Sequence, residues 1–215
     1  MFKTINTNVS AEIVEKKSKF IANVFYVETV EDAEEKVKEI KKKYFDARHN
    51  CFAYSVFTKE GIVNRFSDDG EPSGTAGGPM LNILNGKELT NLVVIVTRYF
   101  GGILLGTGGL IRAYTGATQE ALGKLEEVYK DLGLEVKLVT TYPELEKLKY
   151  YLKQKQIDIT NTEYNETVEV FVDITEEKYN NILKSKENYE LNFELLKTDV
   201  LNEKYIVIEK QNWIE

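Results

Sequence analysis

The sequence predicts an α+β protein made of two domains. Strand-like apolar segments and helix-like amphipathic segments succeed one another along all 215 residues, a length sufficient for two cores. Composition changes near residues 131–135: 12 of the 14 glycines lie between Gly61 and Gly116, and only Gly133 falls after Gly123. We therefore predict an N-terminal domain over residues 1–133 and a C-terminal domain over 134–215.

The first domain is predicted to combine three strands with two helices. Residues 18–27, 51–57 and 92–100 are rich in β-branched and aromatic side chains, and the last of these strands is apolar enough to be buried on both faces. Apolar positions spaced three and four apart from Val30 to Tyr44 predict a helix, with Thr29 as its N-cap. A second helix is predicted over residues 107–126.

The second domain shows a regular succession of elements. A strand over 134–142 leads to a helix that starts at Pro143, and two alternating, antiparallel strands follow, joined near Asn165. A short helix with Thr175 as its cap precedes a final strand-like segment over 192–210. The order βαββαβ predicts a ferredoxin-like domain.

Charge and cysteine content limit the classes of function. The net charge of −7 argues against a nucleic-acid partner, since phosphate binding usually requires a positive surface. From Glu135 onward there are 11 Lys and Arg and 17 Asp and Glu. The residues before Glu135 therefore contain 17 Lys and Arg and 18 Asp and Glu, so the first domain is nearly neutral and can carry a local basic face. One cysteine, Cys51, and the absence of a signal peptide or of about 18 consecutive apolar residues predict a cytoplasmic protein without a membrane partner.

The run RYFGGILLGTGGLIRAYTGA, residues 98–117, has the strand–glycine loop–helix pattern of many phosphate sites. It lacks the lysine of a P-loop, and the third position of a dinucleotide fingerprint is occupied by Ile111, so no cofactor is predicted. Backbone N–H groups at the helix start still suit an anion, with Arg98 and Arg112 near in sequence. Alternatively, the glycines serve close packing, and Arg98 is a buried ion paired with Asp68 or Asp69.

The loop RFSDDGEPSGTAGGP, residues 65–79, carries the candidate catalytic groups Asp68, Asp69 and Glu71. Paired carboxylates serve as acid and base or bind Mg²⁺, but their spacing differs from that of an EF-hand, and no metal site is assigned. The favoured alternative is a polar loop that caps neighbouring backbone and the following helix. His49 is the best acid–base candidate if it lies near this loop, whereas Cys51 is expected to be structural.

Four motifs, KSKFIA, DARHNCFAY, FSDDGEPSGTAGGP and LVVIVTRYFGGILLGTGGLIRAY, occur in an order that resembles the IMPACT family in its two-domain bacterial form. The resemblance implies a first domain of the β-α-β type found in a small-subunit ribosomal protein and in domain four of elongation factor G. It also implies a ferredoxin-like second domain similar to domain five of that factor. Eukaryotic members regulate translation, so a ribosome- or RNA-associated role is implied.

Two hypotheses about function follow. The first is a binding protein in translation regulation, whose RNA, ribosome or protein partner contacts the glycine run and its neighbours. Its predicted binding residues are Arg48, Arg98, Tyr99, Gly101, Gly102, Thr107 and Arg112, and Phe100 joins Tyr99 as an aromatic that stacks on bases. The second is a metal-assisted hydrolase or phosphoryl-transfer enzyme that uses the 68–75 loop and His49. Polar and glycine-rich segments cluster at the ends of strands and helices, so we also predict that His49, the 68–75 loop and the 98–109 run converge on one cleft of the first domain.

Overall fold

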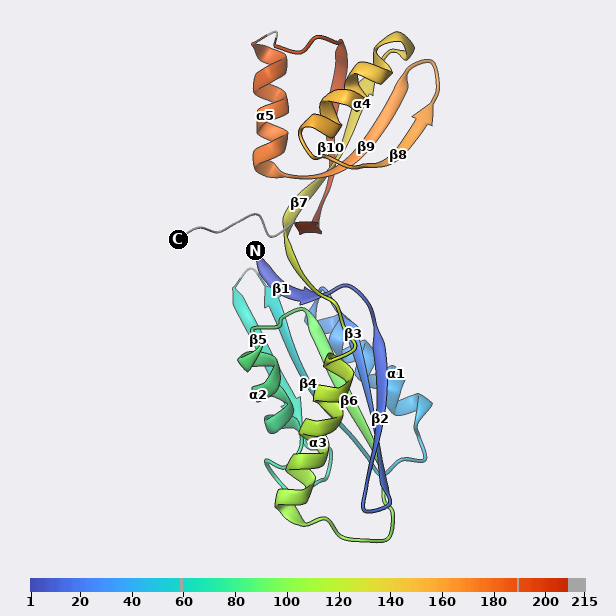
Figure 1. Ribbon diagram of the computed structural model, residues 1–215, viewed down its shortest axis with the longest axis vertical. Coiled ribbons are helices and arrows are strands. Elements are labelled where there is room, and N and C mark those ends of the chain that lie inside the picture. The colour runs from blue at the N-terminus through green and yellow to red at the C-terminus, as the bar shows by residue number, and fades with distance from the viewer. Residues whose placement is uncertain (59, 189, 209–215) are drawn as a thin grey trace. The chain divides into compact units, whose positions relative to one another are not determined.

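The computed structural model describes residues 1–58, 60–188 and 190–208 (Figure 1). The chain forms two compact units, one over Phe2–Tyr129 and one over Lys130–Glu215 together with Met1. This division lies four residues before the predicted boundary at 133. Independent folding of the second domain stays a prediction.

The first unit contains a five-stranded sheet in the order β2-β3-β6-β4-β5, in which every pair of neighbours is antiparallel. A short strand at the N-terminus, β1, pairs with β7, whose first three residues belong to this unit. The strands are β1 (Phe2–Ile5), β2 (Val9–Glu15), β3 (Ser18–Tyr26), β4 (His49–Thr58), β5 (Gly61–Ser67) and β6 (Leu92–Tyr99).

Helices cover both faces of this sheet (Figure 1). On one face, α1 (Val30–Lys43) packs Ala33, Val37 and Ile40 against β4 and β6. On the other face, α2 (Gly77–Gly86) and α3 (Gly106–Leu122) cover the larger core. The central strand β6 is therefore buried on both faces, as its apolar sequence predicted.

The N-cap of α1 follows directly from the sequence. Thr29 Oγ1 accepts a hydrogen bond from the backbone N–H of Asp32, and the Asp32 carboxylate accepts one from the N–H of Thr29. This reciprocal pair is a capping box, and it confirms the predicted start of the helix.

Three elements of the first unit, β1, β2 and β5, escaped prediction, and α2 was expected only as a helix of unstated bounds after the acidic loop. The edge strand β5 is mostly exposed, so its side chains lack the in–out alternation that identifies a strand. The helix α2 begins with Gly77, Gly78 and Pro79, which read as a continuation of the acidic loop. The predicted helix over 107–126 ends at Leu122, just before Gly123.

The second unit has the predicted element order βαββαβ. Its strands are β7 (Glu127–Thr140), β8 (Ile159–Tyr164), β9 (Val168–Thr175) and β10 (Leu195–Ile208), and its helices are α4 (Leu145–Gln154) and α5 (Glu176–Glu187), with a 3₁₀ turn at Tyr142–Glu144. The strands lie in the order β10-β7-β9-β8, and β7–β9 and β8–β9 are antiparallel. Residues 209 and 210 of the predicted last strand lie outside the described residues.

The core of the second unit comes from one face of the sheet and one stripe on each helix. On β9, side chains alternate strictly, and Val168, Val170 and Val172 point into the core. Leu145, Leu148 and Leu152 of α4 cover them, as their spacing along one helix face predicted. Thr175 caps α5 by accepting the N–H of Lys178, which confirms that prediction as well. No helix within the described residues is long and apolar enough to cross a membrane.

Candidate functional site

Asp68 organises the start of the acidic loop and of α2. Its Oδ1 accepts hydrogen bonds from the N–H groups of Ala76 (3.0 Å) and Gly77 (2.9 Å), and its Oδ2 accepts one from Gly74 (2.8 Å). These donors include the first N–H groups of α2, which have no partner within the helix. In this structure Asp68 therefore serves as the cap that the polar-loop alternative requires.

Asp69 ties the loop to β4 and α1. Its backbone adopts a left-handed conformation (φ 43°). Its Oδ2 accepts a hydrogen bond from the backbone N–H of Asn50 (2.7 Å), and its Oδ1 accepts one from Nζ of Lys41 (2.6 Å). The carbonyl oxygen of Asp69 lies 2.8 Å from Nδ1 of His49. Because a carbonyl only accepts, Nδ1 of His49 carries a proton, and in the neutral ring Nε2 is the free acceptor.

Glu71 and Arg98 form a buried ion pair beneath the glycine run. Arg98 Nη1 donates to Glu71 Oε1 at 2.6 Å, and the hydroxyl of Tyr114 donates to the same oxygen at 2.9 Å. The side chains of Arg98 and Glu71 are only 8% and 4% exposed, and Nε2 of His49 lies 4.0 Å from Glu71 Oε1. Arg98 is thus buried, as the packing alternative required, although its partner is Glu71 rather than Asp68 or Asp69.

Aromatic rings enclose the Arg98 guanidinium. Its Cζ lies 5.5 Å from the ring centroid of Phe20 and 5.6 Å from that of Phe100. Phe20 is fully buried and meets Tyr114 edge to face, whereas Phe100 is 51% exposed. The predicted RNA contact through Arg98 would require a guanidinium open to solvent, and this one is enclosed.

Cys51 is a structural residue. Its thiol is fully buried and donates to the carbonyl oxygen of Asp68 at 3.0 Å. Burial raises the pKa of Cys51 to about 12, and burial next to Cys51 and Glu71 also raises the pKa of Tyr114. Both groups stay protonated near neutral pH, so neither is a nucleophile there.

The carboxylates of the loop are directed to different partners. Asp68 binds backbone N–H groups, Asp69 binds Lys41 and Asn50, and Glu71 binds Arg98 and Tyr114. In the part of the chain that the structure describes, no group of three or more His, Cys, Asp or Glu side chains is placed to hold a metal ion. The arrangement therefore supplies structural hydrogen bonds, and His49 lies next to two of the proposed catalytic residues, the carbonyl oxygen of Asp69 and the carboxylate of Glu71.

The glycine run combines close packing with tight turns. The N–H of Gly101 donates to Ser18 Oγ (3.2 Å), and a Cβ at this position would overlap the backbone of Lys17. Gly102 (φ 83°) and Gly106 (φ 73°) adopt left-handed conformations that favour glycine. Thr107, in the first turn of α3, is exposed, and the N-cap residue Leu105 makes no side-chain capping hydrogen bond. Close packing is thus shown for Gly101, while Gly102 and Thr107 remain accessible.

Several Lys and Arg residues of the first unit form no ion pair among the described residues, and most of them lie on segments near the glycine run. Fifteen of its Lys and Arg residues are described, and seven of them form no ion pair with described residues. One of the seven, Lys38, lies in the middle of α1. The other six lie in the β2–β3 turn, at the end of α1, before β4 and near the start of α3: Lys16, Lys17, Lys42, Lys43, Arg48 and Arg112. In Figure 1 the β2–β3 turn and the β6–α3 loop share the lower end of this unit.

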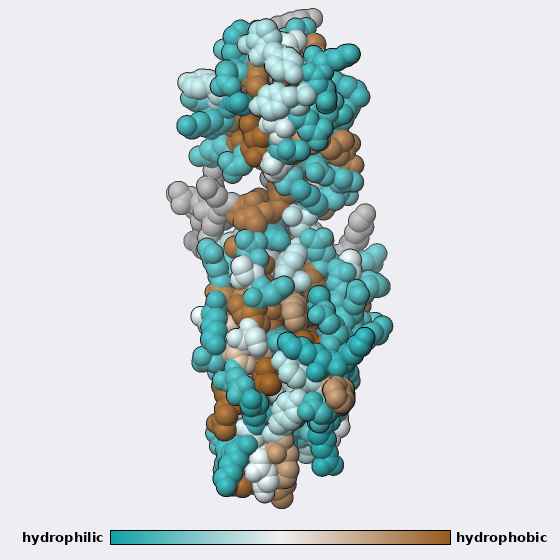
Figure 2. All heavy atoms as spheres, turned by 90° about the vertical axis from the view of Figure 1, so that its right-hand side faces the viewer, coloured by the Kyte–Doolittle hydropathy of each residue, from teal (hydrophilic) through white to brown (hydrophobic). Residues whose placement is uncertain are grey.

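Large apolar side chains are exposed among these cations. Phe45 is 84% exposed and Leu104 is 83% exposed, and both lie in loops next to β4 or β6. Figure 2 shows apolar residues beside hydrophilic ones at this end of the unit.

Tyr99 differs from Phe100, because its hydroxyl donates a hydrogen bond to Asp46 (2.7 Å), and this hydrogen bond raises the pKa of Tyr99 to about 12. We call this end of the unit, with its six cations and the loops and helix segments that carry them, the basic end.

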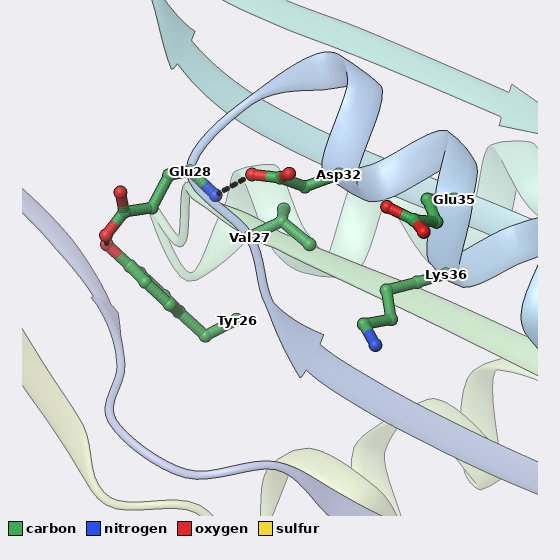
Figure 3. Close-up of a pocket in the computed structure, with 6 residues that line it drawn as sticks. All are labelled: Tyr26, Val27, Glu28, Asp32, Glu35 and Lys36. Carbon is green, nitrogen blue, oxygen red and sulfur yellow. Dashed lines mark hydrogen bonds between the residues drawn. The ribbon is translucent and has the colours of Figure 1, made fainter.

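The three predicted segments adjoin one another in a packed cluster. His49 and Arg98 are register partners on β4 and β6, and the 68–71 segment bonds to both. A pocket lined by Tyr26, Val27, Glu28, Asp32, Glu35 and Lys36 lies at the opposite end of β3 (Figure 3). Asp32 in this pocket already accepts the N–H groups of Glu28 and Thr29, so its carboxylate has a structural role.

The fold and the cluster define a class: a two-domain α+β protein whose first domain fixes a glycine loop over a buried Arg–Glu pair. Residues 16–122 match the family model described as the Impact N-terminal domain, and residues 138–184 match a domain of unknown function (DUF1949). The chain belongs to the IMPACT family, in its bacterial two-domain form. The resemblance carried by the four motifs is thereby confirmed.

Individual relatives agree with this assignment. The chain is 42% identical over 170 residues to the IMPACT family member YvyE of Bacillus subtilis, covering 79% of this chain and 77% of the relative. It is 38% identical over 186 residues to an IMPACT family member of Haemophilus influenzae, covering 84% and 90%. A solved structure titled as that of a hypothetical protein matches with a TM-score of 0.63 and 31% identity, covering 98% of each chain.

Proposed function

We propose that this protein is a cytoplasmic RNA-binding protein that associates with ribosomes and regulates translation, and that the basic end of its first unit is the RNA interface. The observation that carries the proposal is that six Lys and Arg residues without ion pairs among the described residues lie on segments near one end of the first unit, in a protein whose net charge is −7. Lys and Arg without carboxylate partners are free to neutralise phosphates and release counterions. A local positive surface of this kind removes the objection raised by the overall charge.

The acidic loop does not counteract this surface. Asp68, Asp69 and Glu71 each receive hydrogen bonds from groups inside the unit, which partly neutralise their charge. The same bonds hold the 68–76 loop and the glycine run in fixed positions. A rigid loop loses little conformational entropy on binding, which favours its use as a contact surface.

The link to translation rests on the family resemblance. The strand order β10-β7-β9-β8 with βαββαβ connections supports a ferredoxin-like second domain, comparable to domain five of elongation factor G. The resemblance also implies a first domain comparable to domain four of that factor, which supports a role at the ribosome. Similarity of fold is an analogy, so the proposal requires a direct test of binding.

The test compares two cations of the α3 region. Arg112 is exposed, has no ion pair among the described residues and belongs to the basic end, whereas Lys124 follows the opposite end of α3. Co-sedimentation with ribosomes and binding to ribosomal RNA fragments are measured over a range of salt concentrations. Arg112→Glu should weaken association and lower the log–log salt slope by about one unit for each phosphate that the variant no longer neutralises.

Lys124→Glu makes the same change of charge and is the matched control. It should leave association unchanged, because its ammonium lies away from the basic end. Equal weakening by both variants would mean that only overall charge matters, and unchanged association in Arg112→Glu, Lys17→Glu and Arg48→Glu would overturn the proposed interface.

A further inference from the structure

We infer that the basic end recognises single-stranded RNA, with one unpaired base stacked on the ring of Phe100. This inference rests on the proposed RNA-binding function and specifies its ligand. Two features support it. Phe100 is a half-exposed aromatic residue whose ring contacts the buried guanidinium of Arg98, and cations lie on the chain segments around that ring.

The ring of Phe100 is held by a fixed cation. The Arg98 guanidinium, itself buried, lies over this ring at 5.6 Å from its centroid. Arg98 in turn is fixed by Glu71 and by the buried ring of Phe20, so the cation has little freedom to move. One face of the Phe100 ring therefore lies against Arg98, while the residue as a whole is 51% exposed.

A ring held in this way is suited to stacking. Base–aromatic stacking is a main source of affinity for single strands, and it tolerates any base because every base has a π face. A ring that is fixed before binding loses little side-chain entropy when a base stacks on it. The neighbouring aromatic, Tyr99, is less suitable, since its hydroxyl is bonded to Asp46 and its side chain is partly buried.

Cations flank this ring along the chain and in space. The backbone of Gly101, the next residue, packs directly on Lys17 in the β2–β3 turn. On the other side, His49 pairs with Arg98 in the sheet, which places Arg48 next to the strand that leads to Phe100. The phosphates on either side of a stacked base would meet these cations. Bases in a duplex are already stacked on each other, so the ring selects unpaired nucleotides.

The experiment measures the affinity of the full-length protein for a fluorescently labelled single-stranded RNA of about 12 nucleotides, a length within the site sizes of single-strand binders, and for the duplex of the same sequence. We expect tighter binding of the single strand. Phe100→Leu keeps an apolar side chain without a π face and should weaken single-strand binding about 5- to 100-fold, with little effect on the duplex. Phe100→Tyr keeps the ring and should bind the single strand like the unchanged protein.

Phe66→Leu is the matched control. Phe66 lies on the edge strand β5 and is 50% exposed, close to the 51% of Phe100, so an equal effect in both variants would contradict a specific platform. Equal affinity of the unchanged protein for single strand and duplex, together with normal binding by Phe100→Leu, would overturn this inference and leave the proposed function in place. Binding of neither RNA by the unchanged protein would overturn both. The duplex comparison does not depend on any variant, so it decides the question even if Phe100→Leu fails to fold.

Discussion

Arg98 Nη1 donates a 2.6 Å hydrogen bond to Glu71 Oε1, and both side chains are buried. The pair joins the end of the central strand β6 to the acidic loop, 27 residues earlier in the chain. Tyr114 of α3 donates to the same carboxylate oxygen, so one residue connects a strand, a loop and a helix. This connection holds the glycine run in place beside the basic end.

Arg98→Ala should be strongly destabilising. Removing one partner leaves the other charge buried without compensation, which costs about 3–5 kcal/mol of the free energy of unfolding. Urea unfolding followed by circular dichroism measures this cost. Arg65→Ala removes an exposed ion pair with Glu34 and is the control, with an expected cost below about 1 kcal/mol. Similar small costs for both variants would show that the Arg98–Glu71 pair is dispensable.

Gly101→Ala should distort the glycine run and lower stability. A methyl group at Gly101 would overlap the backbone of Lys17, which cannot move without disturbing the β2–β3 turn. Gly86→Ala in α2 is the control, because a Cβ there meets open space and alanine favours a helix by up to about 1 kcal/mol. Thermal unfolding of both variants tests this. A melting temperature for Gly101→Ala equal to that of Gly86→Ala would contradict the predicted overlap.

Asp68→Ala should destabilise α2 and the loop before it. The variant leaves the N–H groups of Gly74, Ala76 and Gly77 without their acceptor, at an expected cost of about 1–3 kcal/mol. Asp68→Asn keeps one carbonyl oxygen, so its stability should lie between that of the alanine variant and that of the unchanged protein. Hydrogen exchange of the α2 amides provides the measurement. Unchanged protection in Asp68→Ala would mean that the cap is unimportant.

Cys51 should be inert toward thiol reagents at neutral pH. Its pKa of about 12 lies above the ordinary value of 9.0, so the folded state favours the protonated thiol. This preference contributes fully to stability below about pH 9 and disappears progressively as the pH rises toward 12. Urea unfolding at about pH 8 and about pH 10.5, on either side of the ordinary pKa, should therefore show a larger fall for the unchanged protein than for Cys51→Ala. Rapid labelling of Cys51 in the folded protein near neutral pH would contradict its burial.

The segment Lys130–Glu215 should fold by itself. Its four strands and two helices bury a core formed within the segment. A well-dispersed NMR spectrum of the isolated segment is the expected result. A segment that starts at residue 134 lacks the part of β7 that includes Gly133, which packs against Ile206, and should be less stable. A disordered spectrum for the longer segment would show that its folding depends on the first unit.

Sequence patterns predicted the elements whose signals are local. The 3.6-residue period of α1 with its Thr29 cap, the alternation along β9 and the apolar run of β6 each lie within one segment. Patterns of this kind give the α+β class and, in the second unit, the βαββαβ order, because each reflects burial of one face or both. Family membership likewise followed from motifs readable in the sequence.

Elements without such a pattern appeared only in the folded chain. The edge strand β5 is exposed along most of its length, so only its pairing with β4 defines it, and α2 starts on glycines that depend on Asp68 for their cap. The identity of the partner of Arg98 was likewise undetermined, because three acidic residues lie close together in the same loop. Strand register and loop conformation bring Glu71 to Arg98 and direct Asp68 and Asp69 elsewhere. Sequence thus determined the type of each segment that carries a local pattern, whereas contacts between distant segments decided which polar groups are buried together and which cations form no ion pair.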